Sequence, residues 1–190
     1  MKKLLLSAVV AASLGFAGLA AAATTQSVDG TVNFTGAVTG STCTVNINSA
    51  GTTASVVLPT VQTSELGTTL GSTAGYTPFT IALSNCTASD GKTKVAPYFL
   101  PSTNILTDGN LKNTSSTGTP ATGVEIALST DAAGASRLNL NAGTVAGQGS
   151  TAATFTTGTA SFTYYAAYYG TGTVTAGTVA STVQFNLAYQ

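Results

Sequence analysis

Side chains that could catalyse a reaction are few and scattered in this chain. Among 190 residues there are six Asp or Glu, six Lys or Arg and no histidine. Histidine is the commonest general base near neutral pH, so its absence removes the usual acid–base catalyst. Neither a G-x-S-x-G nucleophile turn nor a phosphate-binding G-x-x-x-x-G-K-[ST] loop occurs. The residue types argue against an enzyme, and we expect no catalytic residues and no cofactor.

The first residues have the layout of a secretory signal peptide. Lys2 and Lys3 precede an apolar run from Leu4 to Leu19, and the small residues Ala20 to Ala23 follow. This order matches a signal with an A-x-A-like cleavage site. We expect residues 1–22 to be removed, with one or two residues of latitude in the cleavage site. A retained transmembrane helix is the alternative, although the run is marginal for a span.

Cys43 and Cys86 are the two cysteines of the sequence. An even cysteine count in an exported chain indicates a disulfide. Closing the loop between them should stabilise the fold by about 4 kcal/mol in the chain-entropy treatment. A metal site is the alternative, but without histidine zinc would lack its usual third and fourth ligands. We therefore expect a Cys43–Cys86 bridge and no metal.

The composition after the signal indicates strands and turns. Without Lys2 and Lys3, four basic residues stand against six acidic ones, a formal charge of −2. No basic patch is present that would attract nucleic acid. Thr and Val favour strands, whereas the abundant Gly, Asn and Ser favour turns. The apolar clusters recur regularly, which argues against disorder.

Apolar residues alternate in short segments separated by turn residues, as in strands with one buried face. Thr60–Leu66 is expected to form a short helical turn, and Pro97 to mark an edge strand or a bulge. Short strands between turns predict an all-β sandwich of one domain. The expected strands are residues 43–47, 55–58, 78–84, 94–100, 122–128, 162–169 and 183–190.

Another alternating segment, residues 28–36, precedes everything expected in the folded domain. Val28, Val32 and Phe34 share one face with Gly30 and Gly36. The segment could be an ordinary first strand that pairs within its own domain. If it pairs instead with another molecule, the chain is a unit of a polymer.

Several motifs of the mature chain occur together in one known family. They are residues 29–36, the cysteine motifs at 43–45 and 78–86, residues 166–168, Gly177 as the fourteenth residue counted back from Gln190, and the penultimate Tyr189. In these features the chain resembles the major structural subunits of chaperone–usher fimbriae of the type 1 pilus kind.

The resemblance implies an immunoglobulin-like sandwich that lacks its last strand and is completed by a donor strand from another subunit. Residues 23–36 would be the amino-terminal donor-strand extension and residues 37–190 the incomplete domain. In the family a periplasmic chaperone first fills the open groove with one of its own strands. At the outer-membrane usher the extension of the next subunit replaces that strand, a form of β-augmentation.

The resemblance also implies roles for individual residues. Gly30 would mark the closest approach of donor and groove backbones, at a shallow pocket where strand exchange begins. The donor residues would be Val28, Gly30, Val32, Phe34 and Gly36. The terminal strand that lines the groove and contacts the chaperone would carry Gly177, Val183, Phe185, Leu187 and Tyr189.

The expected function is a structural subunit of an extracellular fimbrium that is exported through the periplasm and supports cell adhesion. Its partners would be identical or related subunits arranged head to tail, the chaperone and the usher. The alternative is a minor tip adaptor or adhesin-type binding subunit of the same filament. A tip adhesin of this family usually carries an additional lectin domain and no extension, so the resemblance favours a major shaft subunit.

Overall fold

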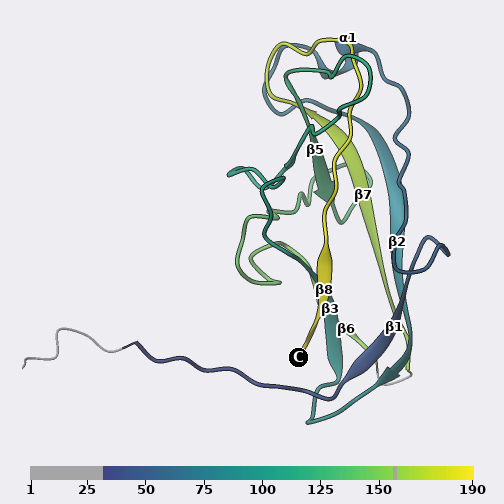
Figure 1. The fold of residues 1–190 in the computed structure, drawn as a ribbon, viewed down its shortest axis with the longest axis vertical. Coiled ribbons are helices and arrows are strands. Elements are labelled where there is room, and N and C mark those ends of the chain that lie inside the picture. Colours follow the sequence, from purple (N-terminus) through teal and green to yellow (C-terminus); the bar gives the residue numbers. More distant parts are fainter. Residues whose placement is uncertain (1–31, 156–157) are drawn as a thin grey trace, which may run out of the picture. The chain divides into compact units, whose positions relative to one another are not determined.

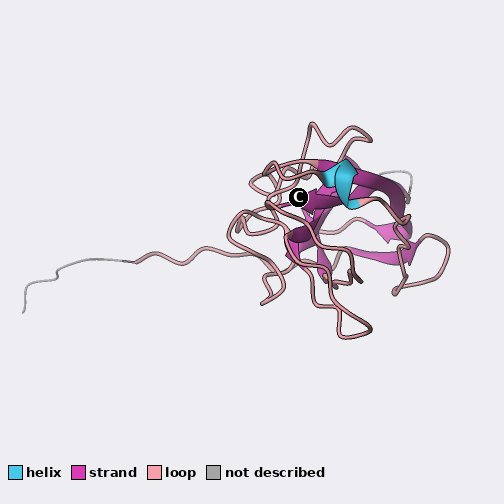
Figure 2. Cartoon of the chain, turned by 90° about the horizontal axis from the view of Figure 1, so that it is seen from above, coloured by secondary structure: helices cyan, strands magenta, loops and turns pink. Residues whose placement is uncertain are grey.

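The computed structural model describes residues 32–155 and 158–190. Val38–Gln190 form one compact unit, built almost entirely from strands and loops (Figure 2). Within the described ranges α1 (Thr63–Leu66) is the one helix, where a short helical turn was predicted. It is far too short to cross a bilayer, and the described residues contain no longer apolar helix. The predicted signal peptide, Val28 and Gly30 lie outside the described residues.

Two antiparallel sheets make up the compact unit (Figure 1). The smaller sheet has the order β6-β3-β8, and β8 lies at its edge with β3 as its strand partner. Its strands are β6 (Ala153–Thr154), β3 (Lys94–Phe99) and β8 (Phe185–Tyr189). The larger sheet has the order β1-β2-β7-β5-β4, with β1 (Thr42–Ile47), β2 (Thr73–Thr87), β7 (Ala160–Gly170), β5 (Val124–Ser129) and β4 (Leu111–Lys112).

The core lies between the two sheets, as the alternation of apolar residues predicts. Ile81 and Leu83 of β2 are fully buried, and Val95 of β3 belongs to the same cluster. The ring of Tyr164 in β7 lies 5.7 Å from that of Phe79 in β2 and 5.5 Å, edge-on, from that of Phe99 in β3. Aromatic pairs at such distances add to the stability given by burial alone. The predicted all-β sandwich is confirmed.

The predicted disulfide is present between Cys43 in β1 and Cys86 near the end of β2. These two strands are direct neighbours in the larger sheet. The bridge therefore fastens the edge strand β1 to a strand that carries much of the core.

Two sequence-based expectations need correction, and a third, the edge at Pro97, holds in part. Residues 55–58 alternate in burial but form no strand, because their backbone has no pairing partner in the described part of the chain. The last strand begins at Phe185 and not at Val183. β3 is a central strand, although β6 pairs only with Lys94 and Val95. Pro97 therefore has no neighbouring strand on the β6 side, so the expected edge exists only locally.

Residues 32–37 belong to a separate unit, Met1–Ala37, and adopt neither helix nor strand. Val32 is 75% and Phe34 92% exposed. Large apolar side chains that are this exposed and lie on one face of an alternating segment are candidates for burial against a partner.

Candidate strand-binding groove

The stretch that leads into β8, residues 177–184, forms backbone hydrogen bonds along only one of its two edges in the described part of the chain. On one side Thr178 N–H donates to Thr119 O at 2.8 Å, and Thr114 N–H donates to Ala180 O at 2.7 Å. Leu100 N–H continues this series to Gln184 O at 2.8 Å. The intervening residues point their backbone groups the other way, since neighbours in an extended chain alternate. The intervening residues are Val179, Ser181 and Val183. Their backbone groups make no backbone hydrogen bond within the described residues.

A second stretch, residues 53–61, is also without backbone hydrogen bonds in the described part of the chain. Val56 and Leu58 are half-buried and pack against the core, whereas Val57 between them is 82% exposed. The stretch therefore has the side-chain pattern of a strand without its partner.

A cavity of about 570 Å³ lies between these two free edges. Ala54, Val56 and Leu58 line one wall, and Val179, Ser181 and Val183 line the other. Its floor consists of core side chains of both sheets: Phe79, Ile81, Phe99, Ile126 and Leu128. An open slot with a free backbone edge on each side and the core beneath it has the form of a missing strand.

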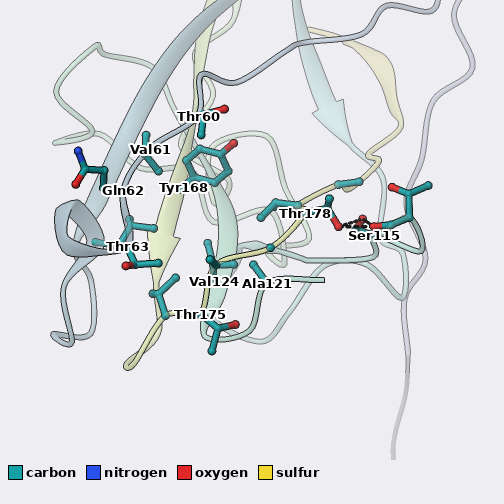
Figure 3. Close-up of a pocket in the computed structure, with 17 residues that line it drawn as sticks. Thr60, Val61, Gln62, Thr63, Ser115, Ala121, Val124, Tyr168, Thr175 and Thr178 are labelled. Atoms are coloured by element: carbon teal, nitrogen blue, oxygen red, sulfur yellow. Dashed lines mark hydrogen bonds between the residues drawn. The ribbon is translucent and has the colours of Figure 1, made fainter. Parts of the chain in front are cut away.

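A second cavity, of about 680 Å³, continues the first, since both are lined by Tyr168, Val179 and Ala180. Figure 3 shows Val61 and Thr63 from the α1 side, and Thr175 and Thr178 from the stretch before β8, around it. Burial raises the pKa of the Tyr168 hydroxyl. We call the two cavities together the groove. Among the described residues, no Asp, Glu, Lys or Arg side chain lines either cavity.

Asn113 holds the outer side of the groove wall. Its Nδ2 donates to Ala121 O and Thr178 O, both at 2.9 Å, and its Oδ1 accepts from Ser115 N–H and Ala180 N–H, both at 3.0 Å. The Ser115 hydroxyl adds a bond to Thr178 Oγ1 at 2.8 Å (Figure 3). The hydrogen bonds of the Asn113 amide therefore hold residues 178–180 from the side that faces away from the 570 Å³ cavity. The backbone edge of Val179, Ser181 and Val183, which faces that cavity, stays free.

The structure separates the five predicted residues of the terminal segment. Gly177 lines the 680 Å³ cavity, and Val183 and Phe185 line the 570 Å³ cavity. Leu187 and Tyr189 lie in β8, outside the lining of both, and pack against the core. The Tyr189 ring lies edge-on to the Phe155 ring, with 5.9 Å between the ring centres. Burial raises the pKa of the Tyr189 hydroxyl, and a hydrogen bond with the Cys43 backbone offsets part of this rise.

Gly177 has a steric reason to be glycine. A Cβ placed on it would overlap Ala121 N and would lie 2.5 Å from Thr119 O. Contacts this short do not occur, so any side chain at this position would push the wall away from residues 119–121.

Sequence reasoning missed the opposite wall and Ser181. The sequence predicts a strand at residues 55–58, but not that this stretch, extended to Ala54, faces a slot. The inward series of the terminal segment begins at Val179 and includes Ser181, whose Oγ is buried and has no hydrogen-bond partner among the described residues.

A family model described as fimbrial protein matches residues 32–190. The chain belongs to the fimbrial protein family. It is 39% identical over 180 residues to the F17 fimbrial protein of Escherichia coli, covering 93% of this chain and 96% of the relative. It is 36% identical over 173 residues to the major fimbrial subunit SMF-1 of Stenotrophomonas maltophilia (strain K279a), covering 86% and 94%.

A solved chaperone–usher pilus structure has the same fold. It superposes with a TM-score of 0.57 at 20% identity, over 87% of this chain and 98% of the other. At that identity the likeness concerns the fold. Membership of the family makes the chain an exported structural subunit of surface fimbriae and not an enzyme, as the sequence predicts.

Proposed function

We propose that this fimbrial subunit is a major shaft subunit and that residues 28–36 of one copy fill the groove of the next. The observation that carries the proposal is the groove itself, an uncharged slot that lies between two free backbone edges and is floored by core side chains. The chain also has a segment of suitable form, since Val32 and Phe34 alternate with polar residues and are exposed.

Both sides gain from strand insertion. The free backbone groups of Val179, Ser181 and Val183 would receive partners, and each inserted hydrogen bond replaces one made with water. Val32 and Phe34 would each contribute roughly 1.5–3 kcal/mol if fully buried. Nine residues in extended form span about 30 Å, which is enough to follow one edge of the sandwich.

Insertion of one copy into the next produces a filament. The extension and the groove are different surfaces, so their contact is heterologous and leaves a free extension and a free groove after every addition. The relatives named major fimbrial subunit favour a shaft subunit over a minor tip adaptor.

The open groove needs protection before assembly. Unpaired strand edges beside an open apolar groove promote aggregation. We infer that a periplasmic chaperone supplies a temporary strand and that an outer-membrane usher is the place of exchange, which fits the fold shared with a chaperone–usher pilus protein.

Deletion of residues 23–36 from the exported chain tests the proposal. The truncated subunit should still accumulate bound to chaperone, because the groove is intact, but it should not insert into a neighbour. A synthetic peptide of residues 24–36 should displace the chaperone from it, which shows that the groove remains competent. Long filaments assembled from the truncated subunit alone, seen by electron microscopy, would refute the proposal.

A further inference from the structure

Ser181 interrupts an otherwise apolar face of the groove wall. The half-buried residues of the terminal segment on this face are Val179, Ser181, Val183, Phe185, Leu187 and Tyr189. The five others pack against the core cluster. Ser181 lines the 570 Å³ cavity, and its buried Oγ has no partner in the described part of the chain. The smallest inward side chain that the terminal segment contributes to this cavity is therefore Ser181, and it lies over the core.

We infer that Ser181 fixes the register of the incoming strand by leaving room for Phe34 of the neighbouring copy. This inference rests on the proposed function. Side chains that lie directly opposite on paired strands share one face and compete for the same space, so a large residue fits best against a small one. Phe34 is the largest residue of the donor face, and Ser181 is the smallest of the inward-facing residues, Val179, Ser181, Val183 and Phe185, that the terminal segment contributes to the 570 Å³ cavity.

The same alignment matches the rest of the donor face when the two strands run antiparallel. Phe34 opposite Ser181 then places Val32 opposite Val183 and Gly30 opposite Phe185. The absent side chain of Gly30 leaves space for the Phe185 ring, which stands 6.1 Å from that of Phe99. In a parallel arrangement Gly30 would face Gly177, and no donor glycine would lie opposite Phe185.

The backbone supports this pairing. The groups of Val179, Ser181 and Val183 point to the open edge, so these residues would form the hydrogen-bonded pairs of an antiparallel ladder. A shift by one residue would turn Val32 and Phe34 away from the core. A shift by two would place Phe34 against a valine, so the space at Ser181 selects a single register.

The test measures how fast synthetic peptides of residues 24–36 displace chaperone from the purified chaperone–subunit complex. Ser181→Val fills the space, whereas Ser181→Ala keeps it and removes the hydroxyl. We expect Ser181→Val to slow displacement by the native peptide about tenfold or more, as overpacking predicts, and Ser181→Ala to change it less than about threefold. With the Ser181→Val subunit, a Phe34→Ala peptide should displace chaperone no more slowly than the native peptide does.

A second measurement needs no variant of the subunit and applies even if Ser181→Val yields no complex. A peptide carrying both Val32→Phe and Phe34→Val keeps composition and hydrophobicity but exchanges the large and small positions. It should displace chaperone from the unmodified subunit about tenfold more slowly than the native peptide.

Three results would overturn the inference: equal rates for the native and exchanged peptides, a native rate on the Ser181→Val subunit, or equal slowing by Ser181→Ala and Ser181→Val. In each of these cases the native peptide still displaces chaperone from the unmodified subunit, so the donor-strand proposal itself stands. If the native peptide displaces none, that proposal fails, and the register inference fails with it.

Discussion

The side-chain amide of Gln148 pairs with the backbone of Phe99 as a neighbouring strand would. Phe99 N–H donates to Gln148 Oε1 at 3.0 Å, and Gln148 Nε2 donates to Phe99 O at 2.7 Å. Nε2 also reaches Leu140 O at 3.1 Å and Ala142 O at 3.2 Å, and Gln148 is fully buried. Because β6 pairs only with the first residues of β3, this amide completes the edge that β6 leaves open.

Replacing Gln148 with leucine should therefore destabilise the subunit. The substitution leaves the N–H and O of Phe99 buried without partners, and we expect a loss of about 2–5 kcal/mol in the free energy of unfolding. Denaturant unfolding of the peptide-filled subunit measures it. Gln184→Leu is the matched control, because that side chain is exposed, and it should change stability by less than about 0.5 kcal/mol. Equal stabilities of the two variants would contradict the prediction.

Replacing Gly177 with alanine should weaken the groove wall. The added Cβ would overlap the backbone of residues 119–121, and relieving that overlap should cost about 1–3 kcal/mol. Thermal unfolding of the chaperone-bound subunit should show a lower midpoint. Gly143→Ala serves as the control, since a Cβ there meets nothing within 4 Å. A Gly177→Ala midpoint equal to that of the control would show that the wall accommodates the methyl group.

A Gly30→Val peptide should displace chaperone slowly. In the inferred register the valine would compete with the Phe185 ring for one space, so Phe185→Leu in the subunit should restore part of the rate. Peptide carrying Thr31→Val is the control, because residue 31 would lie on the opposite face of the inserted strand. Equal rates for the Gly30→Val and native peptides would show that a side chain at this position is harmless.

Stability should depend on pH through Glu125. Burial raises the pKa of this carboxyl, and the nearby Asp108 carboxylate adds to the rise. Two groups lower the Glu125 pKa: the Asn110 amide and, through its charge, Arg137. The Nδ2 of Asn110 donates to the Glu125 carboxylate at 2.8 Å and to the Asp108 carboxylate at 2.7 Å. Lys112 on β4 and Tyr169 on β7 are its register partners.

A carboxyl whose pKa is higher in the folded state holds more protons there than in the unfolded chain. Stability is therefore lost as pH rises from the ordinary glutamate pKa through the raised one. Glu125→Gln removes this loss, so its thermal midpoint should exceed that of the unmodified subunit at pH 7–8, with the difference shrinking towards about pH 4. A difference that is constant with pH would contradict this account.

Alternation in the sequence predicted which side chains are buried far better than which strands pair. Residues 78–84 alternate and form part of β2, and residues 55–58 alternate equally well but have no partner in the described chain. Periodicity records the direction of a side chain, whereas pairing depends on a second segment that can be distant in sequence or belong to another molecule.

The polar residues of the fold could not be assigned from local pattern. Gln148 lies in a Gly-rich stretch that is typical of a surface loop, and only the open edge of β3 explains its burial. The family resemblance pointed to Gly177, but its contact with residues 119–121 depends on the tertiary fold. Ser181 gave no signal, because one serine among alternating valines fits any half-buried strand.

The uncharged lining of the groove has a consequence for the surroundings in which subunits can join. Salt screens the attraction between exposed charges, with a screening length of about 10 Å at 0.1 M ionic strength. Apolar burial and main-chain hydrogen bonds involve no such charges, so salt does not screen them. The extension contains one ionisable side chain, Asp29, which in an inserted strand would lie on the face opposite Val28 and Phe34. Joints made in this way should therefore hold almost equally well in dilute and in saline media, where the ionic strength is set by the environment and not by the cell.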